Sequence, residues 1–132
     1  MTLSLPLTVP VTKRKKFSLN LNNYRNTHFQ TLNKAKKIYR DLVWDAYIIA
    51  NRRGVTLQPP FRLTYTVYPK TKRRCDVANI ATVVDKFACD ALVELRLMDD
   101  DDYLHVPIVV YQIGKVDKEH PRCELTIESL CG

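Results

Sequence analysis

The chain lacks an apolar run as long as the roughly 18 to 20 residues that a membrane span requires. No secretory signal is expected, because MTLSLPLTVPVTKRKK (1–16) is apolar first and basic afterwards, the reverse of the order in such a signal. No repeat or low-complexity linker divides the 132 residues, and 45% of them are hydrophobic, which is typical of a globular chain. We therefore expect one soluble domain in the cytoplasm, with no membrane partner.

The cysteines lack the spacing of a metal site. Cys75, Cys89, Cys123 and Cys131 form no CxxC pair and have no clustered histidines beside them, which argues against bound zinc. A disulfide framework is not expected in a domain with this much apolar material. We predict four reduced thiols, most of them packed in the core.

Acidic residues are scarce relative to basic ones. The chain has 21 lysines and arginines against 14 aspartates and glutamates, a formal net charge of +7. The cations gather in four segments: KRKK (13–16), KAKK (34–37), NRR (51–53) and KTKRR (70–74). Clustered cations suit a polyphosphate partner, because each neutralised phosphate releases counterions. A solvated basic surface is the alternative, and the charge alone favours nucleic acid only slightly.

Four adjacent aspartates stand out in this basic chain, in the segment LMDDDDYLHV (97–106). Two carboxylates repel each other by about 4 kcal/mol at 4 Å and an effective dielectric constant near 20. A run of them therefore requires solvent, a cation or a basic neighbourhood. Both a solvated acidic turn and a metal-binding turn fit this pattern.

The hydrophobic periodicity predicts an α/β (α+β) fold with a small mixed sheet and two main helices. TLSLPLTV (2–9) alternates apolar and polar residues, and we expect it to form an edge strand because Pro6 and Pro10 keep it out of a central position. The stretch NNYRNTHFQT (22–31) is polar and shows no period. The other expected elements are strands at 16–21, 62–68, 106–114 and 122–129, a helix from a cap at Asn33 to a stop at Gly54, and a helix over 79–95.

Carboxylates flank the second of these helices. Asp76 precedes it, the aspartates at 99–102 follow it, and Asn79, Thr82, Lys86 and Asp90 recur along it at steps of three or four residues. Oxygen ligands beside a lysine suit Mg²⁺ and a charged phosphate, which suggests metal-assisted phosphodiester hydrolysis. The alternatives are a carboxylate that favours the helix dipole at Asp76, an ordinary surface ion pair between Lys86 and Asp90, and a solvated turn.

Three ordered motifs resemble the RusA family of Holliday junction resolvases, especially those of phages and prophages. They are PFRLTYTVYPKTKRRCDVANI, DKFACDALVE and LMDDDDYLHV. NLNNYRNTH and YRDLV resemble the segments that the family carries earlier in its chain, so that the resemblance spans about 17–129. On this basis 17–132 is a RusA-like nuclease domain, 1–16 is an N-terminal strand and basic extension, and a phage-encoded chain would act in the host cytoplasm.

The resemblance implies a homodimeric endodeoxyribonuclease that resolves four-way DNA junctions in recombination and repair, with Mg²⁺ as cofactor and Mn²⁺ as the alternative. Asp76 and Asn79 match the first aspartate and the Asn of the family's Asp-x-Asp-Asn element, and Lys86 matches its essential lysine. Asp100 and Asp101 match its Asp-Asp pair. DNA contacts are expected from Lys70, Lys72, Arg73, Arg74 and Asn79, extended by Lys13, Arg14, Lys15 and Lys16.

One departure concerns the metal. Ala78 stands where the Asp-x-Asp-Asn element has its second aspartate, and the following helix is about one turn longer than in the family. Asp85, beside Lys86 on the extra turn, either supplies the missing carboxylate as a metal ligand and catalytic residue or is an ordinary surface residue. If nothing replaces the aspartate, the chain would bind branched DNA and cleave it weakly or not at all.

Overall fold

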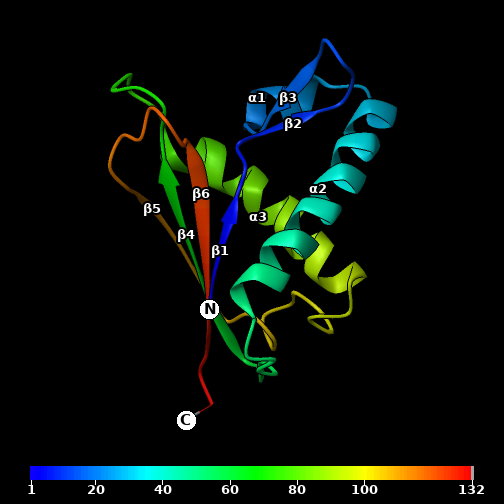
Figure 1. Cartoon of the computed structure of the whole chain (residues 1–132), viewed down its shortest axis with the longest axis vertical. Coiled ribbons are helices and arrows are strands. Elements are labelled where there is room, and N and C mark those ends of the chain that lie inside the picture. Colours follow the sequence, from blue (N-terminus) through cyan, green and yellow to red (C-terminus); the bar gives the residue numbers. More distant parts are fainter. Residues whose placement is uncertain (132) are drawn as a thin grey trace.

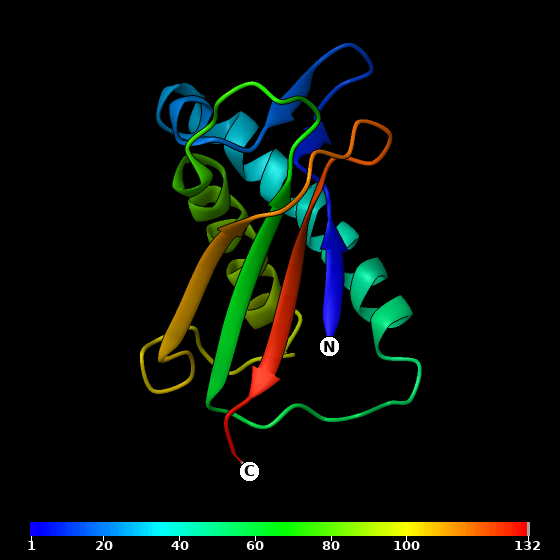
Figure 2. The ribbon, with the colours of Figure 1, turned by 90° about the vertical axis from the view of Figure 1, so that its left-hand side faces the viewer.

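Four strands form one mixed sheet in the computed structural model, which describes residues 1–131. Their order is β1 (Thr2–Leu5), β6 (Arg122–Ser129), β4 (Phe61–Tyr68) and β5 (Ile108–Ile113). β6 runs antiparallel to both of its neighbours, whereas β4 and β5 are parallel. Figure 2 looks onto this sheet, with β5 at one edge and β1 at the other.

Two long helices cover one face of the sheet (Figure 1). α3 (Val77–Glu94) connects the parallel strands β4 and β5 and packs against both of them, and α2 (Phe29–Ala50) packs against α3 and β1. The short α1 (Leu21–Asn26) lies beside α3. β2 (Thr8–Pro10) and β3 (Lys16–Ser18) form a separate hairpin.

The alternation of each strand decides which face is buried. Phe61, Leu63, Tyr65 and Val67 of β4 face the helices and are almost fully buried, and Cys123, Leu125 and Ile127 of β6 continue this layer.

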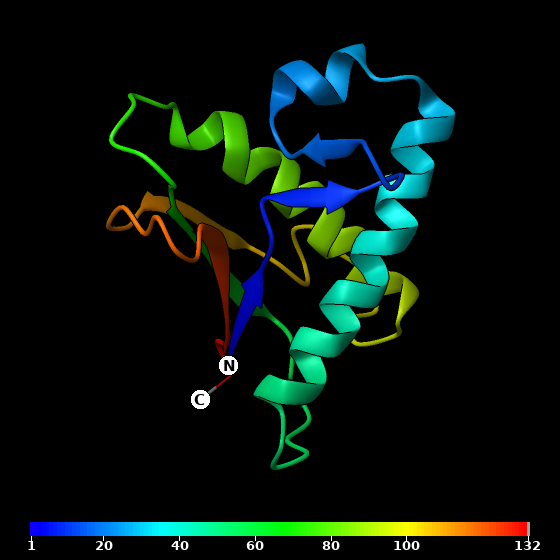
Figure 3. The same cartoon turned by 45° about the horizontal axis from the view of Figure 1, so that its top comes forward.

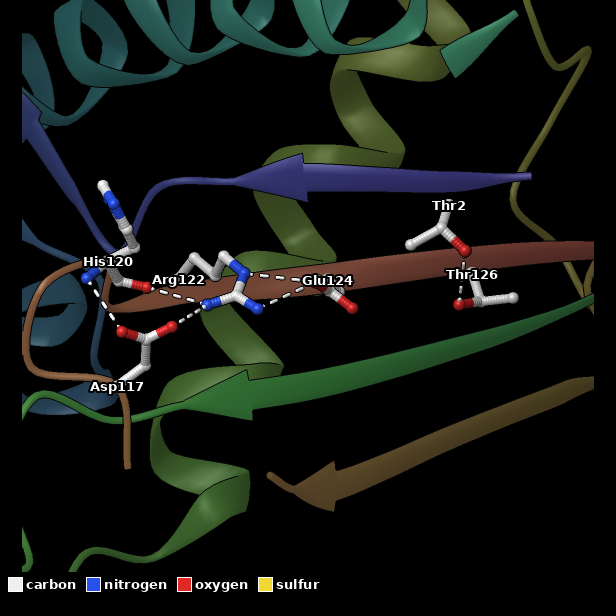
Figure 4. A network of polar contacts seen from close by, with 6 residues as sticks. All are labelled: Thr2, Asp117, His120, Arg122, Glu124 and Thr126. Atoms are coloured by element: carbon white, nitrogen blue, oxygen red, sulfur yellow. Dashed lines mark hydrogen bonds and ion pairs between the residues drawn. The ribbon is translucent and has the colours of Figure 1, made fainter. Parts of the chain in front are cut away.

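The opposite face of the sheet is polar. On it Thr2 and Thr126 share a hydrogen bond of 3.1 Å, and the Arg122 guanidinium donates to Asp117 (2.7 Å) and Glu124 (3.1 Å) (Figure 4). Because two carboxylates already neutralise Arg122, this face offers little free positive charge.

The structure confirms a single mixed α+β domain with two main helices, corrects the start of one helix and adds a short third one. α2 begins at Phe29 rather than after Asn33, because the His28 ring accepts a hydrogen bond from the Gln30 backbone N–H (3.2 Å). The stretch expected to be irregular contains α1, whose first turn is closed by the Asn20 side chain accepting from the backbone N–H of Asn23 (2.8 Å).

The N-terminal strand expected in residues 1–16 joins the core, whereas the basic residues 13–16 are exposed. β1 pairs along its whole length with β6, and Leu3 and Leu5 are essentially inaccessible to solvent. Val9 and Val11 are also buried. The alternation of apolar and polar residues explains this result, because such a strand buries one face as soon as a sheet edge is available.

The four thiols are free, as predicted, but only Cys89 and Cys123 are buried, whereas Cys75 and Cys131 are exposed. Within residues 1–131, no helix has the length and the apolar character needed to cross a membrane.

Candidate functional site

A basic loop joins β4 to α3 and projects beyond the end of the sheet, as Figure 3 shows. It carries the predicted DNA-binding residues Lys70, Lys72, Arg73 and Arg74, and all four side chains are exposed. Among the described residues, none of the four forms an ion pair with a carboxylate. The loop therefore presents positive charge that the chain itself does not neutralise.

The loop and the start of α3 line an open cavity of about 520 Å³. Lys70, Arg73, Arg74, Asp76 and Asn79 contribute to its wall. Asp76 caps α3, since its carboxylate accepts a hydrogen bond from the backbone N–H of Ala78 (3.1 Å). The positive end of the helix dipole adds to the field of the three lining cations, so the cavity suits an anion such as a phosphate group.

Asn79 has a structural partner in addition to the predicted DNA contact. Its side-chain oxygen accepts a hydrogen bond from the backbone N–H of Leu21 (3.2 Å), which fixes the start of α1 against the first turn of α3. Asn79 therefore shapes the wall of the cavity from a half-buried position.

The second basic segment, Lys13 to Lys16, lies in the turn of the β2–β3 hairpin and at the start of β3. The Thr12 hydroxyl accepts hydrogen bonds from the backbone N–H groups of Arg14 (3.3 Å) and Lys15 (2.9 Å), which leaves the four cationic side chains exposed. Figures 1 and 2 place this turn at the same end of the molecule as the loop before α3. The two basic segments predicted to contact DNA therefore lie at one end of the molecule.

The four aspartates lie at the other end of α3 (Figure 1). The backbone N–H groups of Leu97 and Met98 both donate to the Leu92 carbonyl, and these bonds close the end of the helix. Asp101 follows three residues after Met98. At 1.5 Å per residue, sixteen residues separate Asp76 from Leu92 by about 24 Å. Asp76 and Asp101 of one chain therefore lie on the order of 20 Å apart and do not share one metal ion.

The aspartates differ in their surroundings. Asp100 accepts a hydrogen bond from the backbone N–H of Asp101 (2.7 Å). The pKa of Asp101 is raised above its ordinary value, first by partial burial and then by the neighbouring charges of Asp100 and Asp90. A cation bound beside Asp101 would lower this pKa again, because it would stabilise the ionised carboxylate.

Asp102 is half-buried against His105. Its carboxylate accepts from the backbone N–H (3.1 Å) and contacts the ring Nδ1 (2.6 Å) of His105. This contact lowers the pKa of Asp102 and raises that of His105. In the sequence, the spacing of three residues between Asp102 and His105 is the signal that indicates this contact.

Asp85 is held by hydroxyl and thiol groups rather than by a basic residue. One carboxylate oxygen accepts from the Tyr65 hydroxyl (2.8 Å) and the Cys89 thiol (3.1 Å), and the other accepts from the Tyr111 hydroxyl (2.7 Å). Burial, followed by the charge of Asp85, raises the pKa of the Cys89 thiol far above its ordinary value. Asp85 is nine residues beyond Asp76, or about 13 Å along the helix, so it does not replace a carboxylate at Ala78 within the chain.

Replacing this carboxylate gives a stability prediction. Asp85→Asn puts an amide where three donors converge, so at least one donor loses its acceptor. We expect the free energy of unfolding in urea to fall by about 1–3 kcal/mol. Asp99→Asn is the matched control, because the exposed Asp99 forms no side-chain hydrogen bond or ion pair among the described residues. Equal stability of the two variants would show that the cluster does not stabilise the fold.

Lys86 and Asp90 do not pair with each other. The Asp90 carboxylate lies 3.4 Å from the Lys36 ammonium of α2, and the Lys86 ammonium lies 5.7 Å from the centre of the Tyr24 ring. Lys86 is exposed and forms no ion pair with a carboxylate of the described chain, so its charge is available to a bound anion.

A single chain does not assemble the predicted metal site. Within residues 1–131, no group of three or more His, Cys, Asp or Glu side chains is arranged to hold a metal ion. Neither any family model nor any curated protein matches this sequence. The likeness to the RusA family therefore stays a prediction from the motifs, and the cationic cavity at the start of α3 is what the structure adds to it.

Proposed function

We propose that this chain is a structure-selective endonuclease that binds branched DNA, four-way junctions above all, and cleaves it in Mg²⁺ or Mn²⁺. The observation that carries the proposal is the cavity in which unneutralised cations of the loop before α3, the positive end of the helix and the Asp76 carboxylate lie together. Cations recruit the phosphate backbone, and a carboxylate beside them is the group that a nuclease needs next to the scissile phosphate.

The basic residues position DNA without reading its sequence. Lys70, Arg73 and Arg74 neutralise phosphates at the cavity, and Lys72 adds to them from the same loop. The cations of the β2–β3 turn at the same end of the molecule extend this contact. Backbone contacts of this kind respond to the shape of the nucleic acid, since the phosphates of a junction follow a path that a linear duplex does not offer.

The distance between the two carboxylate positions supports a homodimer. Asp76 and Asp101 lie at opposite ends of α3, so a site that uses both must take them from two copies of the chain. A two-fold dimer would contain two identical sites, which matches the two symmetric strands cut in a four-way junction.

Substrate choice tests the proposal directly. The purified chain is incubated with a labelled four-way junction, a linear duplex, a flap and an RNA duplex, each with and without Mg²⁺. We expect nicked product from the junction only, and only with the cation. Preferential cleavage of flaps or RNA would assign a different nuclease activity, and no cleavage of any substrate would leave the binding function described next.

A junction-binding protein with weak or no cleavage is the second candidate. It is favoured by Ala78, which leaves the first turn of α3 without a second carboxylate, and by the hydrogen bonds that hold Asp85 away from Asp76. A gel-shift assay separates the two candidates, because a retained complex without nicked product in Mg²⁺ would support binding alone.

The salt dependence of binding tests the role of the loop. Lys72→Ala with Arg73→Ala should weaken junction binding and reduce the slope of log affinity against log salt by about 2, roughly one for each lost phosphate contact. Fluorescence anisotropy with a labelled junction measures both quantities. Arg52→Ala with Arg53→Ala is the control, since these exposed cations follow α2 and lie outside the loop. An unchanged slope for the loop variant would place the DNA elsewhere.

A further inference from the structure

β5 is an edge strand, and no other strand of the described residues 1–131 pairs with its outer side. Four of its six side chains are large, apolar and exposed: Ile108 (41%), Val109 (43%), Val110 (37%) and Ile113 (53%). The strand contains no charged residue and no proline, the devices with which proteins usually keep an edge from pairing. Figure 2 shows β5 as the outermost strand on this side of the sheet.

The opposite edge of the same sheet, β1, is short and covered. β1 is only four residues long, ends before Pro6 and packs against α2. Its apolar side chains Leu3 and Leu5 are buried, and its remaining side chains are short and polar. One chain therefore contains a covered edge and an apolar open edge, and this difference indicates that the open edge is completed by another strand.

The backbone of β5 fixes how a further strand can bind. Gly114 donates its N–H to the Val67 carbonyl of β4, and residues two apart in a strand point the same way. The polar backbone groups of Val109, Tyr111 and Ile113 therefore point away from β4. In an antiparallel pair centred on Tyr111, these three residues all form backbone hydrogen bonds with the second strand. In a pair centred on Val110, Ile113 would lie opposite Pro107, which has no N–H to donate.

Charge identifies the occupant as a second copy. The acidic run 99–102 precedes β5, and the cations of the loop before α3, together with Lys115, lie at the other end of the strand (Figure 2). In an antiparallel pair of identical strands, the acidic end of each chain meets the basic end of the other. Parallel pairing would place like charges together, so the edge is complementary to itself in one orientation only.

We propose that two chains associate through β5, antiparallel and centred on Tyr111, so that their sheets become one continuous sheet. Val109 then lies opposite the partner's Ile113 on the helix-covered face, and Val110 lies opposite the partner's Gln112 on the polar face. The α3 helices lie side by side and antiparallel, about 10 Å apart, the normal distance for packed helices. The dimer of the proposed function rests on the same pairing, which sets Asp76 of each chain at the Asp101 end of the other.

The oligomeric state of the full chain without DNA tests this interface. Sedimentation velocity should give a particle of twice the 15.3 kDa chain mass, and Val109→Lys with Ile113→Lys should give a monomer with an unchanged circular dichroism spectrum. Ile48→Lys with Ile49→Lys is the matched control, because these α2 residues are 50% and 64% exposed and lie away from β5. The proposal fails if the unmodified chain is a monomer, or if only the α2 variant dissociates.

A disulfide tests the register and does not depend on weakening the fold. In the proposed pairing, residue 110 lies opposite residue 112 of the partner in a pair without direct hydrogen bonds, about 4.5 Å apart at Cα, within the range of a disulfide. Val110→Cys with Gln112→Cys, in a chain whose Cys75 and Cys131 are changed to serine, should form a covalent dimer on oxidation. Val110→Cys alone should not. A covalent dimer of the Val110→Cys variant, or none of the double variant, would overturn the register.

The two proposals fail separately. A dimer that leaves junctions intact would contradict cleavage and keep the interface, because the oligomeric state is measured without DNA. A monomer that resolves junctions at the normal rate would contradict the interface and keep the nuclease.

Discussion

Asp76→Asn and Asp101→Asn should each lower junction cleavage in Mg²⁺ by about 100-fold or more, because losing one carboxylate beside a divalent cation removes several kcal/mol of transition-state stabilisation. Junction affinity should not fall, since it depends on cations that both variants retain. Asp99→Asn is the matched control within the acidic run, and we expect it to cleave normally. Initial rates of nicking and gel-shift titrations give the two readouts.

A mixture of the two variants sharpens this test. If each site combines Asp76 of one chain with Asp101 of the other, a dimer with one chain of each variant has one doubly altered site and one intact site. Mixing should therefore restore nicking of a single strand, although neither variant acts alone. No recovery would place both carboxylates of a site in one chain, and full cleavage by either variant alone would remove that residue from the site.

Phe87→Ala should lower the free energy of unfolding by about 3–5 kcal/mol, the usual result of emptying a buried aromatic site. Phe87 is 1% exposed, and its ring lies 5.8 Å from that of Phe17 and 5.5 Å from that of Tyr39. Since small domains are stable by only about 5–15 kcal/mol, much of the stability would be lost. Urea denaturation measures the change.

Phe29→Ala serves as the control for this prediction, because Phe29 is 64% exposed and its loss should cost no more than about 0.5 kcal/mol. A small effect at Phe87 combined with lost junction binding would instead indicate a wedge that enters the DNA. The burial of the ring and its aromatic neighbours already favour the core, as the helical period of the sequence predicts.

Local periodicity predicted most of the fold, because burial follows the strand and helix repeats. β4, α3 and β6 lie within two residues of the predicted ranges. β1 is the first half of the predicted edge strand, whose second half is β2 in the separate hairpin. The short α1 was missed because its capping side chain, and not an apolar stripe, defines its start. The partner of β1 was not predicted, because only the pairing with β6 shows where an alternating strand goes.

Less of the candidate site than of the fold could be predicted from the sequence. The four cations of the loop before α3 follow from composition, and the structure leaves them exposed. The separation of Asp76 from Asp101 could have been deduced, since a helix expected over 79–95 is by itself about 25 Å long. The contacts of Asp85 with Tyr65 and Tyr111 could not, because they join residues 20 and 26 positions apart through tertiary packing.

The central strand β6 has a consequence for the order of folding. It is the last strand along the described chain, yet it pairs with both β1 and β4, and Thr126 contacts Thr2 across a separation of 124 residues. Pairing strands that are far apart in the sequence costs conformational entropy, because a long loop must close, and this slows folding. During synthesis, β1 and β4 must therefore wait for β6 to leave the ribosome, and until then the unfinished sheet exposes apolar edges to aggregation and to chaperones.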